Sequence, residues 1–271
     1  MFISDYTQKL TLRSVWVWQQ WINPIDTGDF NNNIKTWQHY YVNEAHYTLE
    51  RNSTLHPFDI NLVLRQGSDF VCAWADAHFK ISYKQKNQGL FIRVFAGGFP
   101  MYNKASSDIS APLPLLNLSN STYSNYTYWF QKDYMYDENF IDRNGRSNFL
   151  GRQIGTGGGG FYSITNVGAT NKFLTAVNVS SSIYRFIPVR PFASLGLVVD
   201  NTNKASVAAE FGISTIVVKD VFEIHLPLLT TKNISNNQDL MGIGKWYQKF
   251  SFTLELKFPK INSVLKQLTG T

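Results

Sequence analysis

Apolar and polar residues alternate one by one along several stretches of the chain, which is the pattern of a β-strand with two different faces. In residues 71–84 the odd positions are apolar or aromatic, while Asp76, His78 and Lys80 stand at even positions. A strand of this length exceeds the usual length of about five to six residues and suits a tilted strand that crosses a membrane. Similar alternation predicts strands at 58–65, 207–214, 221–228 and 249–258.

The rest of the chain extends this all-β pattern. Stretches rich in β-branched and aromatic residues predict further strands at 9–21, 35–51, 89–99, 123–131, 172–182 and 189–200. Turn-rich stretches lie between them, at 27–33, 102–120, 142–160 and 231–244. A helical period is hard to find, and residues 261–268 alone could form a short helix. We therefore predict one antiparallel all-β domain over residues 1–271, with about ten to twelve strands.

Alternation does not say whether the apolar face covers a protein core or meets lipid. In a soluble β-barrel or sandwich the apolar residues point inward, whereas an outer-membrane barrel turns them toward lipid and keeps polar residues in its lumen. The apolar faces here are nearly unbroken, the opposite faces mix charges, and short turns alternate with long polar loops, all of which favours a transmembrane β-barrel. Aromatic residues that would form an interfacial girdle gather near strand ends: Trp16, Trp18, Trp21, Tyr40, Tyr41, Tyr126, Tyr128, Trp129, Phe130, Trp246 and Tyr247.

Composition narrows the class of protein. The 271 residues are 44% hydrophobic, 15% aromatic and only 16% charged, which excludes a disordered chain and a charge-rich coiled coil. No run of about 18 apolar residues is present, so we expect no transmembrane helix. The single cysteine, Cys72, excludes an internal disulfide and a multi-cysteine zinc site.

The charge and the N-terminus carry two further expectations. The net charge is +6, but the basic residues are scattered, so we expect no nucleic-acid partner. Residues 1–10 lack the basic region, apolar stretch and small-residue cleavage site of a secretory signal. Because a transmembrane β-barrel must be exported, we expect this chain to be part of a longer protein whose export signal lies upstream.

Several short segments resemble a known family. Lys219–Leu229 and Lys245–Leu254, together with 47–60, 89–97 and 187–193, resemble the C-terminal outer-membrane barrel of aminopeptidase-N-like (gluzincin) zinc-metallopeptidase-related proteins of Gram-negative bacteria. The resemblance implies a location in the bacterial outer membrane and a peptidase domain N-terminal to the barrel. That domain uses His-Glu-x-x-His, a spacing that none of the five histidines here provides: His39, His46, His56, His78 and His225.

Other candidate chemistry also has a simple structural interpretation. Gly155–Gly160 contains G-x-G-x-x-G but no following helix is expected, so we interpret it as a flexible loop. Pairs and triplets of polar residues share a strand face without forming a recognisable nucleophile or metal set. They are Glu223 and His225; Asp76, His78 and Lys80; and Lys249, Ser251, Thr253 and Glu255. Cys72 is interpreted as structural. We therefore predict no catalytic, cofactor-binding or metal-binding residue and no enzymatic activity for this chain.

Function is expected to follow from the barrel. The leading hypothesis is a membrane anchor or docking subunit of a cell-envelope complex, in contact with outer-membrane lipid and with envelope proteins through loops 102–120, 142–160 and 231–244. The alternatives are a soluble β-barrel that binds a small apolar ligand and a barrel hydrolase with an unrecognised site. We expect a lumen filled by long side chains rather than an open pore: Arg65, Lys80, Arg93, Glu210, Glu223 and Lys249.

Overall fold

The computed structural model of the chain describes ten ranges: 6–23, 34–53, 55–84, 88–103, 115–119, 152–155, 158–182, 188–200, 202–218 and 221–254. The predicted strand 123–131, the predicted helix 261–268 and Glu255 lie outside these ranges.

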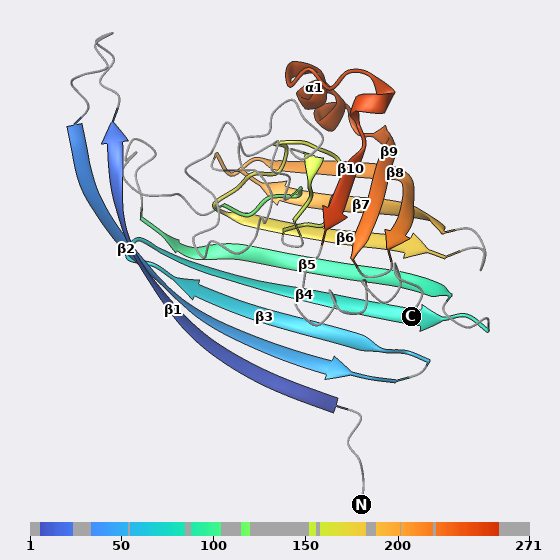
Figure 1. The fold of residues 1–271 in the computed structure, drawn as a ribbon, viewed down its shortest axis with the longest axis horizontal. Helices are drawn as coiled ribbons and strands as arrows, with labels where there is room; N and C mark the ends of the chain where they lie inside the picture. The colour runs from blue at the N-terminus through green and yellow to red at the C-terminus, as the bar shows by residue number, and fades with distance from the viewer. Residues whose placement is uncertain are drawn as a thin grey trace, which may run out of the picture.

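Ten strands form a single antiparallel sheet within the described residues, and each strand pairs with its neighbours in the chain (Figure 1). The strands are β1 Tyr6–Asn23, β2 Ile34–Arg51, β3 Phe58–Gln66, β4 Phe70–Ser82, β5 Gly89–Tyr102, β6 Phe173–Ser181, β7 Val189–Val199, β8 Ala205–Val218, β9 Phe222–Thr230 and β10 Ser251–Leu254. The predicted all-β, antiparallel class is therefore confirmed, with strand ends mostly within a few residues of those expected. The order runs from β1 to β10 without closing, so among the described residues the sheet has two edges.

The connections between strands differ at the two ends of the sheet. At one end, β2–β3, β4–β5, β6–β7 and β8–β9 are joined by short turns, as at 52–57 and 219–221. At the other end lie the shorter connections β1–β2, β3–β4 and β7–β8 together with two long ones, β5–β6 over residues 103–172 and β9–β10 over residues 231–250. We call these the short-turn end and the long-connection end.

One predicted loop is a helix in the structure. Residues 231–244 were expected to be a polar loop, but Lys232–Leu240 forms helix α1 and Trp246–Gln248 forms a 3₁₀ helix, η3. Ile234 and Gln238, which are four residues apart and share a helix face, are both fully buried. The many Asn and Ser residues obscure this narrow stripe in the sequence. No helix among the described residues is long and apolar enough to cross a membrane.

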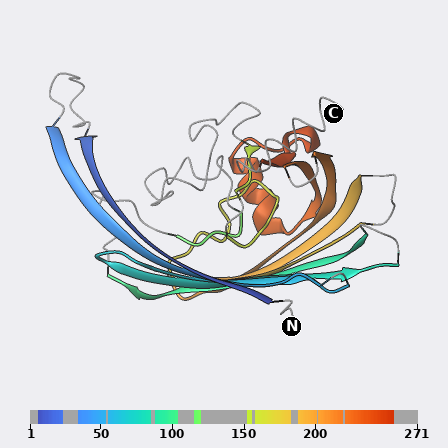
Figure 2. The same ribbon diagram turned by 60° about the horizontal axis from the view of Figure 1, so that its bottom comes forward.

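The sheet is strongly curved, and part of the β5–β6 connection lies within its concave side (Figure 2). We call residues 115–119, 152–155 and 158–172 the inner segment. Main-chain hydrogen bonds join residues 115–119 to 158–172: Leu116 and Thr170 exchange a pair, and the amide of Phe161 donates to the carbonyl of Leu118. Residues 152–155 bond to β10 instead, where the amide of Ile154 donates to the carbonyl of Phe252. Loops 102–120 and 142–160 were expected to be exposed docking loops, but in the described parts Leu116, Leu118 and Ile154 are buried.

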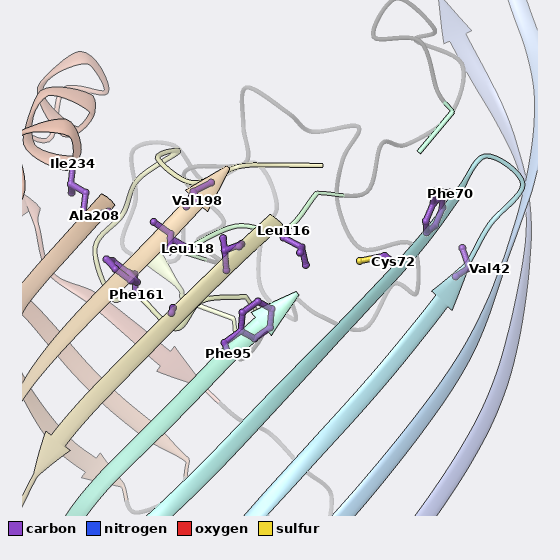
Figure 3. Close-up of a cluster of buried hydrophobic side chains, with 12 residues drawn as sticks. Val42, Phe70, Cys72, Phe95, Leu116, Leu118, Phe161, Val198, Ala208 and Ile234 are labelled. Carbon is purple, nitrogen blue, oxygen red and sulfur yellow. The ribbon is translucent and has the colours of Figure 1, made fainter. Parts of the chain in front are cut away.

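A buried apolar cluster attaches the inner segment to the sheet (Figure 3). Leu116, Leu118 and Phe161 of the inner segment pack with residues of six strands and of α1. The other members are Val42, Phe70, Cys72, Phe95, Leu174, Ala176, Val198, Ala208 and Ile234. Cys72 is thus buried in this cluster, in keeping with the structural role that we predicted for it.

Candidate functional site

Contacts with the inner segment show which strand residues face the concave side. Arg93 of β5, Asn178 of β6 and Glu210 of β8 all hydrogen-bond to the inner segment. Because side chains alternate between the two faces of a strand, their neighbours in sequence point to the convex side. The strand registers, such as Val94 opposite Val177, extend this assignment across the sheet.

The convex face carries no charged side chain from β3 to β10 among the described residues. Several of its large apolar residues are exposed, including Leu62 at 45%, Leu195 at 56% and Val207 at 56% relative accessibility, whereas Phe252 of β10 is buried. Thr175, a polar residue on this face, donates its hydroxyl hydrogen bond to the main-chain carbonyl of Phe95 at 2.8 Å. The convex face therefore presents an apolar surface in which this hydroxyl group is already paired.

The concave face carries a network of charges instead. Arg93 forms two hydrogen bonds with the carboxylate of Asp76, at 2.8 and 2.7 Å. His78 lies beside Asp76 and approaches Asp59 through Nδ1 at 2.7 Å. Arg65 pairs with Glu44 of β2 at 2.6 Å. Asp76, His78 and Lys80 share one face, as predicted. Asp76 and His78 are paired with other strand residues of the concave face, and the Lys80 ammonium lies over the ring of Phe91.

Glu223 and His225 also point to the concave side, but they have separate partners. Glu223 lies 3.6 Å from Arg190, while His225 is fully buried between the hydroxyls of Ser214 and Thr253, at 2.9 and 3.2 Å. Tyr162 of the inner segment stacks on the imidazole with ring centroids 3.8 Å apart. Burial raises the pKa of the Tyr162 phenol to about 12. The arrangement buries this histidine within a packed interface.

Four polar side chains on the concave face of the sheet form hydrogen bonds with main-chain groups of the inner segment. Glu210 accepts hydrogen bonds from the amides of Tyr162, at 2.7 Å, and Ser163, at 2.8 Å. Ser251 donates to the carbonyl of Tyr162 at 2.6 Å. Arg93 donates to the carbonyl of Gly158 at 2.8 Å, and the Asn178 amide donates to that of Gly160 at 3.3 Å. We call Arg93, Asn178, Glu210 and Ser251 the latch residues.

The glycine-rich stretch is part of this contact rather than a flexible loop in its described residues. Gly160 has a φ of +73°, and a Cβ there would collide with the guanidinium of Arg93. Glycine at this position therefore permits both the left-handed backbone and the close approach of the inner segment to Arg93 of β5. No helix follows within the described residues 158–172, so the stretch has no dinucleotide-binding geometry.

A cavity of about 700 Å³ lies beside the inner segment on the concave face. Asn52, Pro57 and Val221, from the short turns, line one part of it, while Gly155, Gly160 and Tyr162 of the inner segment line another. Besides His78, its lining has five ionic residues of the concave face, which carry both signs of charge: Glu50, Asp59, Glu223, Lys80 and Arg93. The size suits a small ligand, but the mixed charges indicate no single ligand class.

The remaining candidates have structural contacts too. Ser251 and Thr253 share the concave face, where the first binds the inner segment and the second binds His225. Among the described residues, no group of three or more His, Cys, Asp or Glu side chains could hold a metal ion. Sequence reasoning missed Tyr162, Ser163 and Ser194 as partners of Glu210. An available signal was Glu210 itself, a lone carboxylate between the small residues Ala208 and Gly212 of its strand face.

No protein-family model, curated protein or solved structure matches this chain. The resemblance to the barrel of gluzincin-related proteins therefore stays a prediction from short motifs.

Proposed function

We propose that this chain forms the wall of an outer-membrane β-barrel and serves as a membrane anchor or docking subunit of a cell-envelope complex. The observation that carries the proposal is the polarity of the sheet: among the described residues, the convex face from β3 to β10 has no charged side chain, and many of its large apolar residues, such as Leu62, Leu195 and Val207, are exposed. In a membrane barrel this face meets lipid and the charged face lines the lumen. Closure of the sheet is part of the proposal, because lipid cannot satisfy the open main-chain groups of an edge strand.

The positions of the aromatic residues support the same orientation. Near the short-turn end, Tyr6, Phe58 and Phe79 form a row on the convex face, with centroids 6.2 and 6.1 Å apart in successive pairs. Toward the long-connection end, Trp16 lies 5.7 Å from Tyr41. Tyr6 and Trp16 are ten residues apart on β1, or about 34 Å along the strand. At a tilt of about 40°, this corresponds to a height of about 26 Å, close to the apolar band of a membrane barrel.

The two alternatives have less support. A soluble barrel that binds an apolar ligand requires a mainly apolar cavity, whereas the cavity here has charged groups such as Asp59 and Arg93 beside apolar residues such as Phe192. It would also leave a large apolar convex face in water, which monomeric soluble proteins rarely do. A hydrolase needs a nucleophile within reach of its base, but His225 is fully buried, and the partners of the more exposed His78 are the carboxylates of Asp59 and Asp76. Docking of envelope proteins stays a proposal that rests on the membrane assignment.

The direct test is to refold residues 1–271 in the presence of phosphatidylcholine vesicles and to wash them with urea before flotation. We expect the chain to float with the lipid fraction and to require detergent for extraction. As a matched control, a variant with Leu195→Glu and Leu197→Glu on the convex face should stay in the soluble or aggregated fraction. A monodisperse, folded chain in buffer without detergent would refute the membrane assignment.

A further inference from the structure

We propose that a basic and aromatic cluster at the long-connection end binds the phosphate groups of anionic membrane lipids. The cluster consists of Arg152, Lys245, Trp246, Tyr247 and Lys249, and we call it the rim cluster. This inference rests on the proposed function, because lipid headgroups surround this end only if the convex face of the sheet lies in a bilayer. It adds the headgroup chemistry that the membrane assignment leaves open.

The aromatic part of the rim cluster is exposed on a well-defined turn. Trp246 and Tyr247 have relative accessibilities of 73% and 49%, and their rings meet edge to face with centroids 6.0 Å apart. The 3₁₀ helix η3 holds them in place: the amide of Lys245 donates to the side chain of Gln248 at 3.0 Å, and the amide of Lys249 donates to the carbonyl of Trp246 at 3.1 Å. Trp and Tyr at the surface of membrane proteins gather at the level of the lipid headgroups.

Pairing of two remote segments brings Arg152 into the rim cluster. The amide of Ile154 donates to a main-chain carbonyl of β10 at 2.7 Å, which sets residues 152–155 beside that strand. The Arg152 guanidinium lies over the ring of Phe250 at 4.3 Å, and its Nη1 donates to the carbonyl of Tyr247 at 3.4 Å. The ammonium of Lys245 lies 5.8 Å from the centre of the Tyr247 ring. Two cationic groups therefore lie directly beside the aromatic pair.

The rim cluster and its surroundings have an excess of positive charge. Besides Arg152, the β9–β10 connection contributes three basic residues, Lys232, Lys245 and Lys249, and one acidic residue, Asp239. Four positive charges and one negative charge leave a net charge of +3. Basic residues at the surface of a bilayer are attracted by anionic lipid headgroups, so the occupant is expected to be negatively charged.

The position of the rim cluster favours lipid over other anions. Leu229 of β9 pairs with Phe211 of β8 on the convex face, and both side chains are exposed. The connection that carries the rim cluster begins two residues after Leu229. An acidic protein surface would match the charges alone, whereas an anionic lipid supplies a phosphate for the basic residues and acyl chains for the adjoining apolar face.

The test measures lipid binding to the full chain in detergent by native mass spectrometry. The probes are phosphatidylglycerol, whose headgroup is negatively charged, and phosphatidylcholine with the same acyl chains and no net charge. We expect the parent to bind phosphatidylglycerol about fivefold more tightly or better. Lys245→Gln with Lys249→Gln should remove most of this preference without changing the affinity for phosphatidylcholine. The matched control is Lys9→Gln with Lys84→Gln, two exposed lysines outside the rim cluster, and it should keep the preference.

Two further measurements separate the parts of the site. Trp246→Ala should weaken the binding of both lipids, because the ring contacts a headgroup whatever its charge. Inorganic phosphate, exchanged for chloride at constant ionic strength, should not displace phosphatidylglycerol. Displacement by inorganic phosphate would assign the rim cluster to a soluble phosphate compound and overturn the proposal.

Equal affinities of the parent for the two lipids, or a preference that survives the loss of both lysines, would also overturn the proposal and leave the rim cluster to another partner such as an acidic protein. Flotation with phosphatidylcholine vesicles shows that each variant still folds and inserts. If the parent does not float with these vesicles, the proposed function is overturned instead.

Discussion

Leu118 of the inner segment packs against Gly196 on the concave face of β7, and the fit depends on the missing side chain of the glycine. A Cβ at position 196 would collide with Leu118 and come within 3.2 Å of the Phe161 ring. Leu118 itself is fully buried. The absence of a side chain at Gly196 therefore lets the β5–β6 connection pack closely against the concave face of β7.

This contact predicts a pair of coupled substitutions. Gly196→Ala should destabilise the fold by about 1–3 kcal/mol through overpacking, and Leu118→Ala by about 2–5 kcal/mol through loss of packing. The double variant should be more stable than the sum of the single changes implies, because the new methyl group occupies space that Leu118 vacates. Urea unfolding in detergent measures all three, with Gly244→Ala as the control, because Gly244 is exposed and an added Cβ would meet only the flexible Asp239 side chain. Additive costs would contradict direct packing of the two residues.

Opposite faces of the sheet should respond differently to a new charge. Leu195→Arg, near the middle of β7 on the convex face, should cost about 2–4 kcal/mol for transfer into the bilayer. Ser180→Arg places the same charge at the edge of the concave cavity, where it should cost much less. Folding yields into vesicles at graded urea concentrations compare the two. Equal tolerance at both positions would count against lipid on the convex side.

Loss of the Asp76 carboxylate, the partner of Arg93, should destabilise the sheet. We expect Asp76→Asn to destabilise the wall by about 3–5 kcal/mol, because it leaves a mostly buried guanidinium without its countercharge. Lys80→Met, which removes a cation that lies over the Phe91 ring, should cost about 1 kcal/mol or less. Thermal unfolding of both variants in one detergent provides the comparison. Similar losses would show that the pairing of Arg93 matters little.

Tyr162 should make stability sensitive to alkaline pH. Its pKa is about 12 in the folded chain and about 10 when unfolded, so only the unfolded state ionises between these values. Stability from this group is therefore complete below pH 10 and is lost as the pH rises toward 12, by about 2–3 kcal/mol in all. Tyr162→Phe should lose less stability between pH 9 and 11 than the parent. The control is Tyr247→Phe at an exposed position, and identical profiles for the parent and Tyr162→Phe would refute the burial of the phenol.

The strand pattern was predictable because a two-residue period is a local property of the chain. Ala73, Ala75 and Phe79 share one face simply because they are two and four residues apart, and the structure places them together on the convex side. Glu223 and His225 were likewise expected on one face, as observed. Helix α1 was missed because only Ile234 and Gln238 mark its buried side, and both contact remote parts of the chain: Ile234 packs in the apolar cluster of the inner segment, and Gln238 donates to the carbonyl of Ile164.

By itself, the sequence determined that the chain alternates between an apolar and a polar face and folds into antiparallel strands. The tertiary structure alone decided that the apolar face is the convex one. Alternation separates two faces of a strand, but only the curvature of the sheet makes one of them convex and the other concave. It also decided that part of the β5–β6 connection lies on the concave side, beside the long polar side chains of the strands. Glu210 and Tyr162 are 48 residues apart, and Leu118 and Gly196 are still farther apart in the chain. Such partners meet only because the strands pair in register and their concave faces then form one surface.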